Sequence, residues 1–171
     1  MSWNPEADLS YTEKQAVLRE YFDAFRPAVV IETGLYNGNG SSYQFHGEAE
    51  IAVFDISEEQ CRIALQRGAT YAIGGDTRDS FAQFLALVTR PALFWLDSHA
   101  VVDVEEENDS PLMEELDAIQ AWPHARESVV LIDDMRMMGL PGWPTVEHVR
   151  AKVAGWWTRS EEADIMRLTP R

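Results

Sequence analysis

Three aspartates that directly follow short apolar segments are the strongest candidates for chemistry in this sequence. Asp97 follows residues 93–96, and Asp133 and Asp134 follow residues 128–132. If these segments are neighbouring strands of one parallel sheet, about 4.8 Å apart, their terminal carboxylates converge at one edge. Close carboxylates repel one another unless a cation or proton intervenes, and oxygen ligands select Mg²⁺, Mn²⁺ or Ca²⁺ over zinc. The three acids therefore predict a divalent metal site; the alternative is that one caps a helix and the others are solvated.

His99 lies two residues beyond Asp97, at the same expected edge of the sheet. Beside a metal and a substrate hydroxyl, a histidine is a suitable general base because its pKa lies near neutral pH. Without that context, a histidine in a loop is an ordinary surface residue. We therefore expect His99 and Asp97 to be the catalytic residues if the metal site exists.

A glycine-rich turn, residues 31–42, follows the first apolar segment and contains Gly34, Gly38 and Gly40. Glycines between a strand and a helix let the backbone approach a ligand closely and leave amide donors pointing outward. Glu32 precedes them, and its charge disfavours a polyphosphate and favours a cationic or hydroxyl-bearing ligand. Tight turns also need glycine for steric reasons alone, so the turn by itself is weak evidence for a ligand.

Two further aspartates end the second and third apolar segments. Asp55 lies about 20 residues beyond the glycine turn, where an acid accepts hydrogen bonds from ribose hydroxyls in nucleotide sites. Alternatively, Asp55 helps to cap a helix that starts near Ser57. Asp76 could contact an adenine amine, or it could be an ordinary turn residue after Gly74 and Gly75. The glycine turn and Asp55 together favour a nucleoside site.

The elements that must position these residues alternate along the chain. Short apolar segments predict strands buried on both faces, as in a parallel sheet covered by helices; they are residues 28–31, 51–54, 71–73, 93–96, 128–132 and 165–168. Helical patterns occupy residues 12–26, 57–67, 81–88, 111–119 and 146–157. The first helix begins with the capping-box spacing of Thr12 and Gln15. This alternation predicts a three-layer α/β fold with a mostly parallel, doubly wound sheet.

Length and composition indicate one domain that avoids polyanions. A chain of 171 residues suits a single domain, with a helical segment over residues 1–27 and an α/β core over residues 28–171. Lys and Arg total 14 against 29 Asp and Glu, which gives a formal net charge of −15. Such a surface repels phosphate backbones and anionic lipid, so we expect no nucleic acid and no membrane partner. The single Cys61 excludes an internal disulfide framework, and no signal peptide is visible, so we expect a cytoplasmic protein.

The order of these motifs resembles that of the class I S-adenosylmethionine (SAM)-dependent methyltransferases. Glu32 with the three glycines, then Asp55, Asp76 and Asp97, follow that order within about residues 28–150. The resemblance implies a Rossmann-like methyltransferase fold and SAM as the cofactor.

The resemblance is closest to the branch of the macrocin O-methyltransferases and cephalosporin hydroxylase-like proteins. In that branch the fourth strand ends in Asp and the fifth in Asp-Asp, and these acids hold a divalent metal. Asp97 and residues 133–134 match those positions. Residues 93–99 and 111–116 also look like those of a group of small bacterial members of this branch.

The resemblance also implies a role for each matching residue. The three glycines would lie alongside the methionine portion of SAM. Glu32 would face the amino or ribose side of the cofactor. Asp55 would contact the ribose and Asp76 the adenine. The family reaction is an in-line methyl transfer to a metal-bound hydroxyl, in which the metal lowers the pKa of the hydroxyl and orients it.

The sequence departs from the family pattern in two places. The macrocin-type enzymes carry a second Asp where this chain has His99, so a histidine base is our inference from the residue itself. The chain also ends after its sixth apolar segment, without a segment for the strand that completes the seven-stranded sheet. We therefore expect the last strand to be missing and the exposed edge to be covered by a second subunit, in a homo-oligomer.

These observations predict a SAM-dependent, Mg²⁺-assisted O-methyltransferase that acts on a small hydroxylated molecule. Two alternatives stay open because a fold does not fix a function. One is a non-catalytic nucleoside-binding or interaction module on the same fold. The other is a metal-dependent hydrolase or lyase that uses the same carboxylates.

Overall fold

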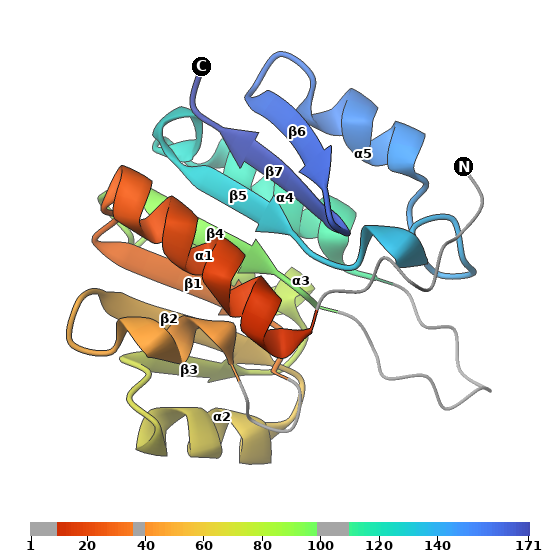
Figure 1. The fold of residues 1–171 in the computed structure, drawn as a ribbon. Coiled ribbons are helices and arrows are strands. Elements are labelled where there is room, and N and C mark those ends of the chain that lie inside the picture. Colours follow the sequence, from red (N-terminus) through yellow and green to blue (C-terminus); the bar gives the residue numbers. More distant parts are fainter. Residues whose placement is uncertain (1–9, 36–39, 99–109) are drawn as a thin grey trace.

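A seven-stranded sheet in the order β3-β2-β1-β4-β5-β7-β6 forms the centre of the protein (Figure 1). The computed structural model describes residues 10–35, 40–98 and 110–171. Five strands pair in parallel: β1 (Val29–Thr33), β2 (Glu50–Asp55), β3 (Tyr71–Gly74), β4 (Ala92–Leu96) and β5 (Val129–Ile132). The other two are antiparallel: β6 (Thr158–Glu162) and β7 (Ile165–Thr169), with β7 between β5 and β6.

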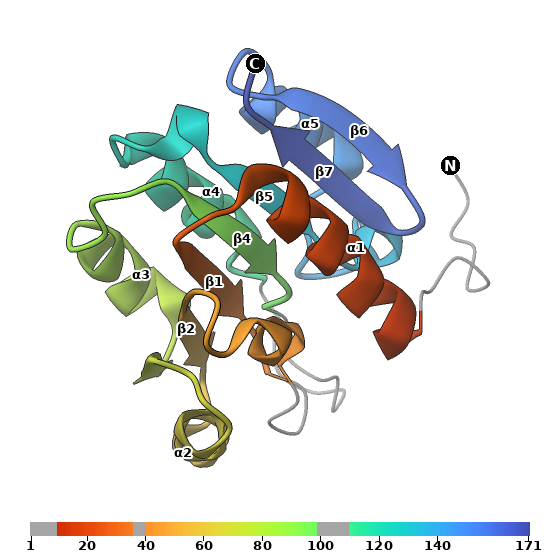
Figure 2. The same cartoon turned by 60° about the vertical axis from the view of Figure 1, so that its left-hand side comes forward.

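Helices cover both faces of the sheet, as the apolar segments predict. One face carries α1 (Tyr11–Phe25), η2 (Ser41–Phe45) and α2 (Glu58–Gln66); the other carries α3 (Thr77–Leu85), α4 (Leu112–Ala121) and α5 (Val146–Val153). Two short 3₁₀ helices, η3 (Ala125–Glu127) and η4 (Met135–Met137), flank β5. Alternate strand residues enter the two cores: Trp95 and Leu131 pack on the α1 side, and Phe94 and Ile132 pack on the α4 side. Figure 2 shows α1 lying across one face, opposite α4.

The expectation that the last strand is missing is wrong, because β6 completes the sheet. β6 has the sequence Thr-Arg-Ser-Glu-Glu and is mostly exposed at the edge, so it carries no apolar segment to reveal it. Ala163 and Asp164 both have positive φ and form the two-residue turn to β7, without the Asn-Gly pair that usually marks such a hairpin. The exposed edge that suggested a second subunit is therefore covered by this chain itself.

The first helix begins two residues earlier than the sequence pattern predicts. Ser10, not Thr12, is the N-cap, and the backbone N–H of Ser10 donates to the Glu13 carboxylate at 2.9 Å. A charged carboxylate is a stronger acceptor than a glutamine amide at the positive end of a helix, which favours this capping box. The predicted cap at Ser57 is confirmed, since its hydroxyl accepts from the backbone N–H of Gln60. None of the helices in the described ranges is both long and apolar enough to cross a bilayer.

Candidate active site at the carboxyl edge of the sheet

Gly34 brings the ends of β1 and β4 into direct contact. It has φ +84°, and a Cβ atom added there would lie 2.2 Å from the carbonyl oxygen of Asp97. Its backbone N–H donates to the carbonyl oxygen of Phe54 at 2.8 Å, so the turn is also joined to β2. The strand order reverses between β1 and β4, and this is where open α/β sheets bind their ligands.

Glu32 lies inside the glycine turn, with its carboxylate buried. One oxygen accepts from the backbone N–H of Ser41 at 2.7 Å, and the other accepts from the N–H and hydroxyl of Ser42 at 3.0 and 2.5 Å. A Cβ on Gly40 would lie 2.6 Å from that second oxygen, so a larger residue there would displace the Glu32 carboxylate. Burial raises the pKa of Glu32 to about 7, against the effect of these hydrogen bonds. Glu32 thus stabilises the start of η2, and its predicted contact with the cofactor stays a prediction.

Asp55 connects the end of β2 to the glycine turn. One oxygen accepts from the backbone N–H of Leu35 and the other from that of Ser57, both at 2.8 Å. The second bond is the capping role that the sequence left open. The first places the half-buried carboxylate directly beside the turn, where the predicted ribose contact requires it.

Asp76 caps α3, a role that the sequence analysis did not assign to it. Its carboxylate accepts from the backbone N–H of Arg78 at 2.8 Å and forms an ion pair with that side chain at 3.1 Å. The adenine contact stays a prediction. Gly38 and His99, which we also predicted to belong to the site, lie outside the described residues.

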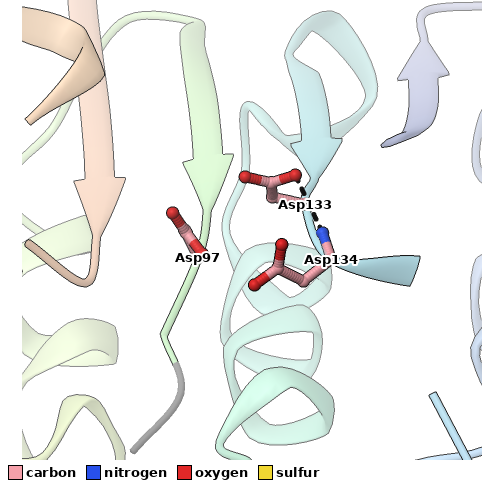
Figure 3. A group of neighbouring side chains, drawn as sticks. All are labelled: Asp97, Asp133 and Asp134. Atoms are coloured by element: carbon pink, nitrogen blue, oxygen red, sulfur yellow. Dashed lines mark hydrogen bonds between the residues drawn. The ribbon is translucent and has the colours of Figure 1, made fainter. Parts of the chain in front are cut away.

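The predicted convergence of the three aspartates is confirmed (Figure 3). Leu96 pairs with Ile132 across β4 and β5, so the residues that follow them are neighbours. Asp97, Asp133 and Asp134 each place a carboxylate oxygen within 4.8 Å of the others. We call these residues the acid trio. Burial, followed by the charges of its two neighbours in the trio, raises the pKa of Asp133.

Two cations that the sequence analysis missed lie against the acid trio. Lys14 of α1 places its Nζ 2.7 Å from Asp133 Oδ2 and 3.1 Å from Asp134 Oδ1. Arg136 lies 2.5 Å from Asp134 Oδ1 and also pairs with Asp164 in the β6–β7 turn. Burial lowers the pKa of Lys14, but Asp133, Asp134 and Asp97 raise it overall, so the ammonium stays charged.

A signal for Lys14 is present in the sequence. Lys14 lies four residues before Leu18 and eight before Phe22, and both of these are buried against the sheet. Residues four apart lie on the same face of a helix. A lysine on the inward stripe of α1 therefore predicts a buried or half-buried acidic partner.

A buried acid lies beneath the edge on the opposite face of the sheet. Glu115 of α4 accepts a hydrogen bond from the Thr33 hydroxyl at 3.4 Å. Burial raises the pKa of Glu115 to about 7. With Asp97, Asp133 and Trp143 it borders a hollow of about 10 Å³, about the size of one water molecule. A larger cavity of about 400 Å³ lies at the opposite edge of the sheet, near Val29, and is remote from these acids.

Glu115→Gln is expected to flatten the decline of stability with pH. The folded-state pKa of about 7 exceeds the ordinary value of 4.5, so the folded state holds this proton more tightly. The stabilisation is complete below about pH 4.5 and falls between pH 4.5 and 7, by up to about 1.4 kcal/mol per pH unit. Urea unfolding from pH 5 to 8 measures it, with the exposed neighbour Glu114→Gln as control. Parallel pH profiles for Glu115→Gln and the wild type would contradict the assignment.

Comparison with known proteins finds similarity in fold and none in sequence-family models. No protein-family model matches the chain, and no curated protein matches it. N-methyltransferase NodS from Bradyrhizobium japonicum WM9, in complex with S-adenosyl-L-homocysteine, matches with a TM-score of 0.57 at 15% identity, over 94% of this chain and 87% of that chain. A Mg-SAM structure of CmcI matches with a TM-score of 0.54 at 18% identity, over 98% and 72%.

A third match is a putative caffeoyl-CoA O-methyltransferase from Staphylococcus aureus. The TM-score is 0.56 at 13% identity, over 92% of this chain and 83% of that chain. At such low sequence identity, these structural matches establish only a shared arrangement of helices and strands. They do not carry a substrate or a reaction from one chain to another.

Proposed function

Because this chain has the Rossmann-like fold of the SAM-dependent methyltransferases, we propose that it transfers a methyl group from SAM to an oxygen of a small hydroxylated molecule. The single observation that carries the proposal is the position of the Gly34 turn. Gly34 packs closely against the backbone of Asp97, and the backbone N–H of Leu35 donates to the Asp55 carboxylate. This arrangement lies at the reversal point of the sheet, where a nucleoside cofactor is expected. The SAH and Mg-SAM complexes among the structural matches support the same choice of cofactor.

The carboxylates of this edge suit the chemistry of SAM. Asp55 offers an acceptor to ribose hydroxyls, and the glycine turn offers backbone amides at close range. The sulfonium of SAM is a cation, and an acidic edge attracts it at long range. Asp76 is proposed to lie near the adenine, and Gly38 and Gly40 to continue the turn along the methionine portion.

The acid trio is the proposed site for the acceptor hydroxyl. Its donors are carboxylate oxygens only, which fits Mg²⁺ and similar hard cations. Asp97, Asp133 and Asp134 would hold such an ion, which supplies a lowered pKa and a fixed position for the hydroxyl. His99 is proposed to accept the hydroxyl proton on a ring nitrogen, and Asp97 to help orient the acceptor.

Calorimetric titration of the wild type with SAM tests the proposal, first with Mg²⁺ and then with EDTA. We expect micromolar affinity, about −8 kcal/mol, in both buffers, because the Asp55 side of the site needs no metal. A screen of phenols and sugars for SAH formation then tests methyl transfer. Absence of SAM binding in both buffers would refute the proposal.

A nucleoside-binding module without transferase activity is the second candidate. The observation that favours it is Lys14, which already neutralises part of the acid trio. Under this hypothesis, the acid trio is a structural ion-pair network and takes no part in a catalytic reaction. SAM affinity would then coexist with no SAH formation from any acceptor, and with no response to Mg²⁺.

A further inference from the structure

We propose that Lys14 is a tethered cation that competes with a divalent metal for the acid trio. A metal ion then binds the trio only when the Lys14 side chain has moved out of it. This inference rests on the proposed function for the identity of the site, but its test measures metal binding directly.

The ammonium already uses the oxygens that a metal would need. Its Nζ lies 2.7 Å from an oxygen of Asp133 and 3.1 Å from an oxygen of Asp134, two of the three members of the trio. A divalent ion at the same oxygens would meet a positive charge at short range, where repulsion is strong. Ammonium and metal are therefore alternative occupants of one site.

Helix α1 holds Lys14 in this position. Leu18, one turn further along, is completely buried, and Phe22 follows it on the same face. At the start of the helix the Tyr11 hydroxyl donates to the Gly40 carbonyl oxygen at 3.1 Å. The side-chain amide of Gln44 donates to the backbone carbonyl oxygen of Gln15, also at 3.1 Å. The backbone of α1 is thus anchored on both sides of Lys14. Displacement of the ammonium requires rotation of the side chain, which is 15% exposed, and the helix can stay in place.

Removal of Lys14 leaves a site that favours another cation. Arg136 pairs with the same Asp134 oxygen as Lys14 and is shared with Asp164. Without Lys14, the three converging carboxylates would lose one positive charge, and their mutual repulsion would increase. A bound divalent ion relieves that repulsion.

The decisive experiment compares Mn²⁺ binding to the wild type and to Lys14→Gln, with free Mn²⁺ measured by electron paramagnetic resonance. We expect Lys14→Gln to bind Mn²⁺ at least about tenfold more tightly, because one nearby positive charge has been removed. Lys14→Arg keeps the charge and is expected to bind as weakly as the wild type. Lys152→Gln, which removes a surface lysine paired with Asp117 on α4, is the matched control and should change nothing. Equal affinity of Lys14→Gln and the wild type would overturn the proposal.

A second measurement uses the unmodified protein, in case Lys14→Gln does not fold. The chain contains only two lysines, Lys14 and Lys152, so acetylation by acetic anhydride can be followed at each by peptide mass spectrometry. With EDTA, Lys14 should react several-fold more slowly than Lys152. At Mn²⁺ concentrations that fill the site, Lys14 should react several-fold faster than with EDTA, while Lys152 keeps its rate. A filled site with Lys14 still protected would overturn the proposal.

The two proposals fail in different ways. If SAM binds but Lys14→Gln gains no metal affinity, only the role of Lys14 is wrong. If Lys14→Gln gains metal affinity but SAM does not bind, the role of Lys14 stands and the proposed function is wrong.

Discussion

Gly34→Ala is expected to destabilise the protein by about 3 kcal/mol or more. The residue has φ +84°, which costs an alanine about 1–2 kcal/mol. Its Cβ would also lie 2.2 Å from the Asp97 carbonyl oxygen, and that oxygen belongs to the backbone and cannot rotate away. The ends of β1 and β4 must therefore separate. Urea unfolding measures the loss, and SAM affinity measured on the folded variant should fall with it.

Gly75→Ala is a matched control for this prediction. Gly75 has φ +111°, but a Cβ there meets no atom of the described residues within 4 Å. Its substitution therefore costs the backbone strain alone, about 1–2 kcal/mol. The difference between the two variants isolates the contact between β1 and β4. Equal losses would mean that this contact gives way easily, and the Gly34 turn would then be a poor basis for a ligand site.

Asp55→Ala is expected to weaken SAM binding about 100-fold, or roughly 2.7 kcal/mol. The change removes the proposed acceptor for the ribose hydroxyls, and hydrogen bonds to a charged group contribute about 1.5–3 kcal/mol each. It also frees the backbone N–H of Leu35, which Asp55 holds at 2.8 Å, so the glycine turn loses its attachment to β2. Calorimetric titration with SAM, in the presence of EDTA, measures the effect.

Two further variants, Asp76→Ala and Asp55→Asn, help to separate the loss of the ribose acceptor from the loss of the hydrogen bond that holds the glycine turn. Asp76→Ala removes the cap of α3 and should cost about 1 kcal/mol of stability, with a smaller loss of SAM affinity. Asp55→Asn keeps one carbonyl oxygen and should retain more affinity than Asp55→Ala. If Asp55→Ala bound SAM as well as the wild type, the nucleoside would have to lie elsewhere.

Much of the fold and part of the candidate site follow from local sequence patterns. β1, β4 and β5 are buried on both faces, which needs unbroken apolar segments, so these strands could be predicted from them. Apolar segments also indicated β2, β3 and β7, although β3 is only half-buried or exposed along its length. The convergence of the acid trio follows from the parallel pairing of β4 with β5, which sets the register of their ends. Both inferences depend on short-range periodicity together with the rules for parallel sheets.

What could not be predicted depends on contacts between distant segments. β6 is a polar strand at the edge, and only its pairing with β7 defines it. Glu32 has the position of a cofactor ligand, yet its carboxylate bonds to Ser41 and Ser42 because the chain folds back on it. Lys14 is separated from Asp134 by 120 residues, and no local pattern relates them.

The hairpin of β6 and β7, which follows β5 in the sequence, is part of the site. Asp164, in the turn between these strands, pairs with Arg136, and Arg136 pairs with Asp134 of the acid trio. During synthesis, a nascent chain that has reached only β5 exposes the edge of that strand and lacks Asp164. The charge pattern around the trio is therefore completed only when the residues through Asp164 have left the ribosome. A chain terminated between β5 and this hairpin is expected to be an aggregation-prone fragment and not a partly active protein.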